Sequence, residues 1–322
     1  MNRIKFKRRI GQVRCAAKYY IVYVISKLYR VHDNAWLIAE RGTDARDNGY
    51  VFYRYLKKVH PEISVKFVIS DTSPDRDRLE TGDIVRYGSF EHYLRYITAP
   101  MLLSTHYQGY SPNFELFSQL DKRGLISVKG KKVLLDHCVR MGKAGCTANT
   151  VKIDLMICSI PREYEALSNN SGYKPSVLCD IGMPRFDNLI DESEKLPIKQ
   201  ILFMPTWDSS VTKMKNDFPV YNPDCVKSDL YKEVNGFLNN KELNEFMDKM
   251  GYKILFKPHP NMKIQMKDFE IGENVIVASD EFSYQDLFAM GAALITDYSS
   301  TFFDFAYLRK PVIYYQARNN HY

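Results

Sequence analysis

The 322-residue chain has a globular composition, with 45% hydrophobic and 26% charged residues. This excludes a disordered or collagen-like chain, and the length predicts about two domains. Nine of the 45 Lys and Arg residues lie in the first 30 positions, which hold no Asp or Glu, and the other 36 nearly balance 38 acidic residues. The net charge of +7 therefore belongs to a basic N-terminal arm, and we predict no nucleic-acid partner, because such binders carry their basic patch on the folded domain.

The N-terminal arm, residues 1–33, predicts a basic amphipathic helix. Its apolar residues recur at steps of three or four, at Ile10, Val13, Ala17, Ile21, Val24 and Leu28. Its longest uncharged stretch after the basic start, residues 19–26, is too short to span a bilayer. We expect residues 1–30 to lie on an anionic membrane surface, with Tyr19, Tyr20 and Tyr23 at headgroup depth. The alternative is a helix that packs this stripe against the protein body.

From residue 34, short apolar runs alternate with amphipathic stretches. The runs predict strands at 35–39, 65–69, 84–87, 101–104, 133–135, 155–158 and 177–181. The amphipathic stretches predict helices at 50–58 and 90–97. Continuously apolar strands alternating with helices indicate a mostly parallel sheet that is covered on both faces.

A polar, acidic stretch at 187–199 predicts a linker to a second domain. Strands are predicted at 200–204, 253–256, 275–277, 292–296 and 311–315, helices at 283–289 and 300–308, and a loop at 208–229. We therefore expect two doubly wound α/β domains, residues 34–190 and 191–322, that face a cleft. Ligands of such sheets bind at the carboxyl ends of the strands.

Two histidines follow predicted strands and are candidate catalytic residues. The strand at 133–135 runs into Asp136 and then His137. His259 lies between Pro258 and Pro260, which make a stiff turn suited to aiming an imidazole. Histidine is suited to proton transfer near neutral pH. Asp136 could orient His137, although neighbouring strand residues point to opposite faces.

Other strand ends carry groups suited to phosphate. Hydroxyls precede the helix predicted at 300–308, where free backbone N–H groups bind anions. Arg185 follows another strand and could clamp a phosphate. The predicted substrate-binding residues are Arg185, Lys257, Asp297, Ser299, Ser300 and Thr301.

Several motifs are absent from the sequence. It has no P-loop, no GxGxxG after the first strand, no HExxH and no GxSxG. No DxD pair follows a predicted strand, and the six cysteines form no CxxC pair. We therefore predict no metal, no cofactor and reduced thiols.

Taken together, several motifs resemble the CDP-glycerol glycerophosphotransferase family, which includes teichoic acid polymerases and primases. The segment from Ile295 to Asp304, the segment from Arg309 to Tyr314, and Lys257 to Pro260 carry most of the resemblance. The segments 36–50, 182–187 and 203–207 extend it, so that it covers most of residues 34–316.

This resemblance implies a GT-B-like pair of Rossmann-type domains, with residues 34–190 on the acceptor side and residues 191–322 binding the CDP-alcohol. It implies transfer of phosphoglycerol, or phosphoribitol, from that CDP-alcohol to a hydroxyl of a lipid-linked polymer, with release of CMP. It implies a peripheral protein at the cytoplasmic face of the cell membrane. It also implies that His137 and His259 match the two motif histidines and that Ser299, Ser300 and Thr301 match the phosphate-binding turn.

The sequence departs from the family pattern at three places. Cys138 replaces the usual glycine after the first motif histidine, and Asp208 replaces a usual arginine. The chain ends at Tyr322, where family members usually continue, so we expect a fragment or an incompletely closed cleft. These departures keep open an inactive, membrane-bound nucleotide-binding scaffold. A sugar-nucleotide glycosyltransferase of the same fold, for capsule or lipopolysaccharide synthesis, also stays open, because the fold alone does not separate the two activities.

Overall fold

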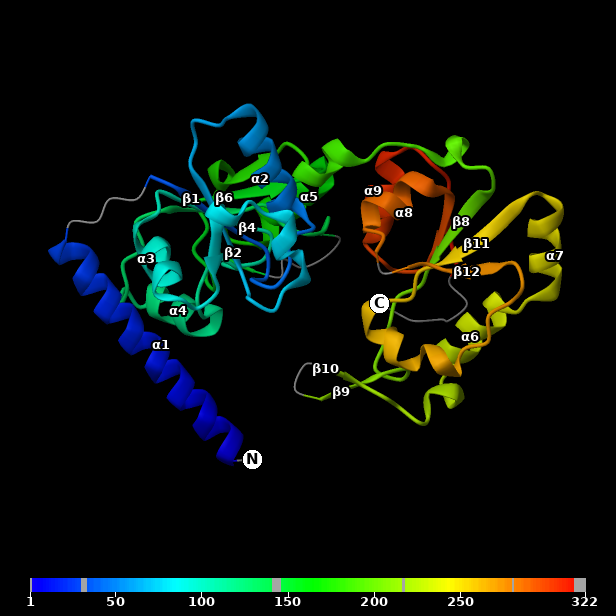
Figure 1. The fold of residues 1–322 in the computed structure, drawn as a ribbon, viewed down its shortest axis with the longest axis horizontal. Helices are drawn as coiled ribbons and strands as arrows, with labels where there is room; N and C mark the ends of the chain where they lie inside the picture. Colours follow the sequence, from blue (N-terminus) through cyan, green and yellow to red (C-terminus); the bar gives the residue numbers. More distant parts are fainter. Residues whose placement is uncertain (1, 30–33, 141–145, 216–217, 280, 316–322) are drawn as a thin grey trace. The chain divides into compact units, whose positions relative to one another are not determined.

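The computed structural model describes residues 2–29, 34–140, 146–215, 218–279 and 281–315. The chain divides into two compact units, residues 1–187 and 188–322. Each unit contains its own parallel sheet with helices packed around it, as Figure 1 shows. The roles predicted for the two domains, acceptor side and nucleotide binding, stay predictions.

The first unit is built on a seven-stranded sheet in the order β3-β2-β1-β4-β5-β6-β7, and every pairing in it is parallel. Its strands are β1 (Trp36–Ala39), β2 (Val65–Ile69), β3 (Ile84–Arg86), β4 (Met101–Ser104), β5 (Lys131–Leu134), β6 (Leu155–Cys158) and β7 (Leu178–Asp180). Its α-helices are α1 (Asn2–Leu28), α2 (Asn48–Val59), α3 (Phe90–Thr98), α4 (Phe114–Lys122) and α5 (Pro161–Asn170). The strand order reverses between β1 and β4, which is where doubly wound sheets bind ligands.

The second unit repeats this topology with five parallel strands in the order β12-β11-β8-β13-β14. Its strands are β8 (Lys199–Met204), β11 (Tyr252–Phe256), β12 (Val275–Val277), β13 (Gly291–Thr296) and β14 (Val312–Tyr314). Its α-helices are α6 (Asp229–Leu238), α7 (Lys241–Lys249), α8 (Tyr284–Met290) and α9 (Thr301–Tyr307). Here the order reverses between β8 and β13. The predicted α/β fold with two Rossmann-type sheets is confirmed.

The apolar runs form strands because both faces of each sheet are buried. Leu37 and Ile38 of β1, and Leu202 and Phe203 of β8, are fully inaccessible to solvent. Such residues leave no polar face, as expected for a parallel sheet covered by helices. All strands predicted from the sequence are present, with ends shifted by no more than two residues.

The loop prediction at 208–229 is wrong in part. β9 (Lys213–Lys215) and β10 (Phe218–Val220) pair as a two-stranded antiparallel ribbon, and a short 3-10 helix follows at Cys225–Lys227. Three-residue strands that include Pro219 carry too little alternation to be recognised from sequence.

The N-terminal helix α1 docks on the first unit, beside α3 and α4 in Figure 1. Tyr19 and Val22 are buried in the core of this unit. The Tyr19 hydroxyl donates to the carbonyl of Ser127 at 2.7 Å and accepts from its N–H at 2.9 Å. The prediction of Tyr19 at headgroup depth is therefore wrong, because its ring fills a protein pocket against Phe117.

The apolar stripe predicted for α1 lies on a different face and stays exposed. Val13, Ile21, Val24 and Leu28 are each more than half exposed, and Ile10 and Ala17 also face solvent. The alternative in which this stripe packs on the protein body is contradicted. No helix among the described residues is long and apolar enough to cross a membrane.

Candidate functional site

The first candidate site lies at the carboxyl end of β5. Asp136 has a φ of 54°, in the left-handed region that few non-glycine residues adopt. This turn brings its carboxylate to the same side as the next residue, so that it accepts the His137 N–H at 2.7 Å and lies 3.3 Å from His137 Nδ1. The expected separation of neighbouring side chains onto opposite faces therefore does not apply here.

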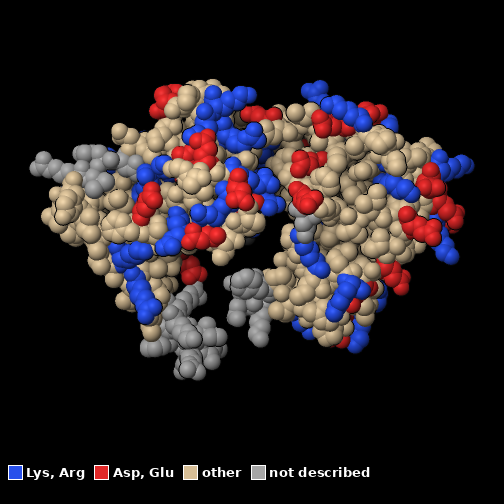
Figure 2. Space-filling model, in the orientation of Figure 1, with Lys and Arg blue, Asp and Glu red and all other residues tan. Residues whose placement is uncertain are grey.

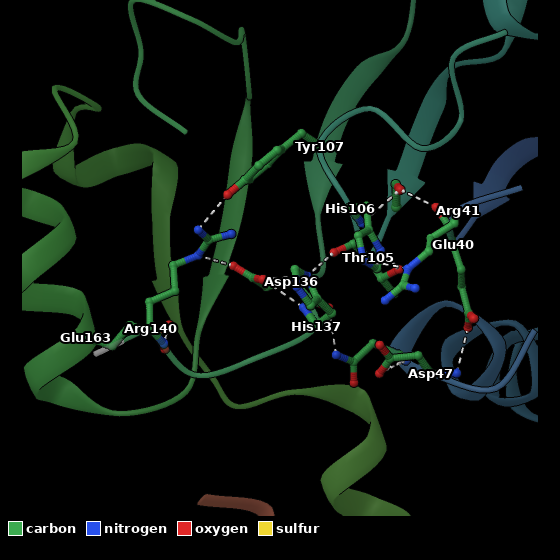
Figure 3. Close-up of polar contacts among 12 residues, drawn as sticks. Glu40, Arg41, Asp47, Thr105, His106, Tyr107, Asp136, His137, Arg140 and Glu163 are labelled. Carbon is green, nitrogen blue, oxygen red and sulfur yellow. Dashed lines mark hydrogen bonds and ion pairs between the residues drawn. The ribbon is translucent and has the colours of Figure 1, made fainter. Parts of the chain in front are cut away.

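Asp136 is held from its other side. Arg140 Nε donates to Asp136 Oδ2 at 2.6 Å, and Arg140 Nη1 donates to the Tyr107 hydroxyl at 2.7 Å. The backbone N–H of Arg140 donates to Glu163 at 2.7 Å. Figure 3 shows Asp136 between Arg140 and His137. The carboxylate is thus fixed in position before any ligand arrives.

These contacts set the charge states of the group. Burial opposes ionisation of Asp136, but hydrogen bonds and charge from His137 and Arg140 outweigh it and lower the pKa of Asp136. The hydrogen bond with Asp136, followed by one with Cys138, raises the pKa of His137 to about 10. His137 Nδ1 also lies 3.2 Å from the carbonyl oxygen of Thr105. Because both neighbours of Nδ1 are acceptors, its proton stays there, and Nε2 is the nitrogen that exchanges protons with a substrate.

A second imidazole, which was not predicted from the sequence, lies against the first. The ring of His106, which follows β4, stacks on His137 with centroids 4.1 Å apart and planes at 12°. Burial, followed by the charge of His137, lowers the pKa of His106 to about 3. Of the two stacked rings, His137 therefore holds the positive charge.

Arg185 is buried and points into the first unit. Its Nη1 donates to Asp47 at 2.8 Å and to the carbonyl of His137 at 2.9 Å, while its N–H donates to the Asn48 side chain at 2.9 Å. Asn48 in turn donates to the carbonyl of Asp136 at 2.8 Å. These bonds hold the backbone of the turn formed by Asp136 and His137. The predicted contact of Arg185 with a phosphate stays a prediction.

The second candidate site lies at the carboxyl ends of the strands of the second unit. His259 follows β11 and precedes the 3-10 helix Pro260–Asp268, and its Nδ1 accepts the N–H of Asn261 at 3.2 Å. Its ring stacks on Trp207, with centroids 5.7 Å apart. Burial lowers the pKa of His259. A neutral imidazole that accepts at Nδ1 carries its proton on Nε2 and is a hydrogen-bond donor there.

Asp297 lies directly after β13 and is almost fully buried. Its carboxylate accepts the N–H of Thr206 at 2.9 Å and the Thr206 hydroxyl at 2.6 Å, together with the N–H of Tyr298 at 2.7 Å. These bonds join the ends of β8 and β13, the two strands at which the order reverses. Asp297 therefore positions the loops that carry Trp207 and Ser299.

The hydroxyl turn begins α9. Ser299 and Thr301 hydroxyls lie 2.8 Å apart, and Ser300 occupies the N-cap position without a side-chain capping bond. Lys257 is buried, and its Nζ donates to the carbonyl of Ser279 at 3.3 Å. Asp208 accepts the N–H of Ser210 at 2.8 Å, as part of the turn after Trp207. Direct contact of these groups with a ligand stays a prediction.

One group among the described residues could hold a metal ion. Ligand atoms of Asp136, His137 and Cys138 lie within 4.8 Å of one another. Arg140 already lies 2.6 Å from this carboxylate and neutralises it. The arrangement therefore favours a carboxylate that orients His137 over one that binds a cation.

Two of the residues not predicted from the sequence share one signal. His106 and Trp207 each follow a buried strand within three residues, at the same sheet edges as His137 and His259. Both are found when the residues after the carboxyl end of every strand, and not only of the most apolar ones, are taken as candidates. Arg140 has no such signal, because its partner is set by the turn at Asp136.

The family model for CDP-glycerol:poly(glycerophosphate) glycerophosphotransferase matches residues 21–322 of the chain. The minor teichoic acid biosynthesis protein GgaB of Bacillus subtilis (strain 168) is 31% identical over 324 residues, which cover 98% of this chain and 35% of GgaB. The teichoic acid ribitol-phosphate primase of Bacillus spizizenii is 31% identical over 176 residues, which cover 50% of this chain and 41% of the primase. The chain spans about a third of the length of these curated relatives.

Solved structures show the same fold at low identity. The wall teichoic acid polymerase TagF superposes with a TM-score of 0.62 at 19% identity, covering 95% of this chain and 79% of that chain. The UDP-GlcNAc 2-epimerase of Methanocaldococcus jannaschii superposes with a TM-score of 0.51 at 11% identity, covering 88% of this chain and 84% of that chain. The fold of this chain is therefore GT-B-like.

Proposed function

Because this chain belongs to the CDP-glycerol:poly(glycerophosphate) glycerophosphotransferase family, we propose that it transfers phosphoglycerol or phosphoribitol from a CDP-alcohol. The acceptor is a hydroxyl of a lipid-linked cell-surface polymer, and CMP is released. A structure of a TagF variant soaked with CDPG, with a TM-score of 0.61 at 17% identity and covering 98% of this chain and 79% of that chain, supports the choice of donor. The observation that carries the proposal is the Asp136–His137 pair in a chain of this family.

In this mechanism, His137 acts as the general base. Nε2 takes the proton of the acceptor hydroxyl as its oxygen forms a bond to the phosphorus that bears the polyol. The bond from that phosphorus to the bridging oxygen of the pyrophosphate breaks, and CMP leaves with the electron pair. Asp136 stabilises the imidazolium, as an orienting carboxylate does in hydrolase triads.

His259 acts as a hydrogen-bond donor and not as a base. Because its Nδ1 accepts the N–H of Asn261, its Nε2–H is available to donate to the phosphates of the CDP-alcohol. Ser299, Ser300 and Thr301 add hydroxyls, and Lys257 adds a positive charge, to stabilise the leaving CMP. Asp297 and Arg185 act as positioning residues for the two histidine-bearing edges.

We propose that α1 holds the protein on the cytoplasmic face of the cell membrane. Its exposed apolar stripe would enter the headgroup region, and exposed Arg14 and Lys27 beside it would meet anionic lipids. The first 30 residues hold basic but no acidic side chains, whereas Figure 2 shows Lys and Arg interspersed with Asp and Glu on the visible face of both units.

The test is CMP release by the purified chain from CDP-glycerol and CDP-ribitol, with lipid-linked acceptor and membranes present. We expect acceptor-dependent release that His137→Ala abolishes while CDP-glycerol binding changes less than about threefold. Turnover of His137→Ala within tenfold of the parent would contradict the base assignment. No release from either CDP-alcohol, with UDP or GDP released from sugar nucleotides instead, would contradict the donor.

A further inference from the structure

Arg41 lies beside the two stacked imidazoles and has no role in the mechanism above. It follows β1, the strand next to β4 in the sheet, and its Nε donates to Nε2 of His106 at 3.0 Å. Figure 3 shows Arg41, His106 and His137 in one continuous group. The Arg41 side chain is 61% exposed, so its far end faces solvent.

The hydrogen bond from Arg41 defines the state of His106. Because Nε2 of His106 accepts, its other nitrogen carries the proton, and Nδ1 lies 2.9 Å from the Thr105 hydroxyl. His106 is therefore a neutral support that fixes the guanidinium without cancelling its charge. Arg41 makes one long ion pair, in which its Nε lies 3.9 Å from Asp44 Oδ2.

The other arginines near this edge are already paired with carboxylates. Arg46 binds Asp75 at 2.7 Å, Arg140 binds Asp136 at 2.6 Å, and Arg185 binds Asp47 at 2.8 Å. Arg41 differs because its ion pair with Asp44 is longer and uses Nε, and no hydrogen bond or ion pair of its two terminal amino groups occurs among the described residues. A fixed, exposed guanidinium fork with free amino groups suits a phosphate, which it binds in a bidentate manner.

We propose that Arg41, held in place by His106, binds a phosphate of the acceptor chain next to the hydroxyl that His137 deprotonates. This inference rests on the proposed function and makes Arg41 a specificity-determining residue. It distinguishes acceptors that end in a polyol phosphate from those that end in an unphosphorylated sugar. His106 is a positioning residue, since it acts through Arg41.

The test is binding of sn-glycerol 3-phosphate, and of glycerol as a neutral probe, to the full chain by calorimetry. We expect glycerol 3-phosphate to bind at millimolar concentration and glycerol not to bind. Arg41→Ala should weaken glycerol 3-phosphate binding at least tenfold and leave CDP binding within twofold. Arg54→Ala, which changes an exposed arginine on α2, is the matched control and should change neither.

His106 is tested by rescue. His106→Ala should weaken glycerol 3-phosphate binding, and His106→Gln, which keeps a side-chain acceptor for Arg41 Nε, should restore at least half of the loss in binding free energy. Glycerol 3-phosphate binding that is absent in the parent, or unchanged in Arg41→Ala, would overturn the proposal. CMP release, measured in parallel, distinguishes a failure of the proposed function from a failure of the role of Arg41. Arg41-dependent phosphate binding without CMP release would overturn only the proposed function. CMP release without Arg41-dependent phosphate binding would overturn only the role of Arg41.

Discussion

His137 carries most of the proposed chemistry, and its neighbours decide when it is a base. The ordinary pKa of histidine is near 6.5, whereas the hydrogen bond with Asp136 raises that of His137 to about 10. The stacked His106 is neutral and Arg140 is paired with Asp136, so the carboxylate dominates. In the absence of ligand, the imidazolium is the major form at neutral pH.

Replacing Asp136 with Asn should therefore move the pH profile of turnover. In the parent, the rate should rise about tenfold per pH unit from pH 7 to about 9, because deprotonated His137 accumulates as the pH approaches its pKa. In Asp136→Asn, the pKa of His137 falls, so the profile should level off at lower pH. Steady-state rates of CMP release at saturating donor would measure this.

The control is Asp44→Asn, which removes a neighbouring carboxylate that does not contact His137. Superimposable profiles for the parent and Asp136→Asn would contradict the role of Asp136.

The pKa shifts of this pair also affect the stability of the fold. The raised pKa of His137 means that its charged form contributes fully to stability below pH 6.5 and that this contribution is lost as the pH rises through about 10. The lowered pKa of Asp136 means that its own contribution is lost in acid, as the carboxylate becomes protonated.

Among the elements, α1 carries apolar side chains on two faces, one buried and one exposed. Tyr19 and Val22 pack into the first unit, whereas Ile21 and Val24, on the other face, are exposed. Side chains three or four residues apart share a helix face, so these two sets do not mix. One face anchors the helix to the protein, and the other stays exposed, which is the face proposed to contact the membrane.

Substitutions on the two faces should have separable effects. Tyr19→Ala should lower the free energy of unfolding by about 3–5 kcal/mol, because it empties a buried aromatic pocket and removes the bonds to Ser127. The double change Ile21→Ser and Val24→Ser should change stability by less than about 1 kcal/mol but weaken binding to phosphatidylglycerol vesicles. Denaturant titration and vesicle sedimentation measure the two effects.

The matched control for the exposed pair is Val22→Ser, which should lower stability because Val22 is buried. If the exposed double variant sediments with vesicles as the parent does, the stripe has no role at the membrane. If Val22→Ser is as stable as the parent, the docking face has been assigned wrongly.

At the scale of the whole molecule, each unit has its own sheet and its own core. Buried residues from β1, β2, β4 and α3 form one core in the first unit, and buried residues from β8, β11, α6 and α7 form another in the second. A ligand that binds one unit should therefore stabilise that unit directly.

We expect CDP to slow hydrogen exchange in the second unit alone. Protection should appear at the ends of β11 and β13, near His259 and Ser299, and should be lost in His259→Ala. Hydrogen exchange followed by mass spectrometry measures this, with the strands of the first unit as the internal reference. Protection at the end of β5, around His137, would instead assign the nucleotide to the first unit.

The sequence by itself determined the parallel sheets, all of their strands, and the family. Runs such as Leu37 to Ala39 and Leu202 to Met204 are local patterns, and their meaning does not depend on what packs against them. His137 and His259 were predicted because each lies within three residues of the end of such a run, and because Pro258 and Pro260 bracket His259. The ribbon at 213–220 was not, since its strands are too short to show a period.

Only the tertiary structure decided which side chains act together. His106 stacks on His137, and Arg41 reaches His106, because β1, β4 and β5 are neighbours in the sheet although they are far apart in the chain. The left-handed turn at Asp136 brought two adjacent side chains to one side, against the pattern of a regular strand. The tertiary structure also decided which face of α1 is buried. Apolar residues occur on both faces, and the choice depends on the shape of the surface that receives the helix, a property no local pattern contains.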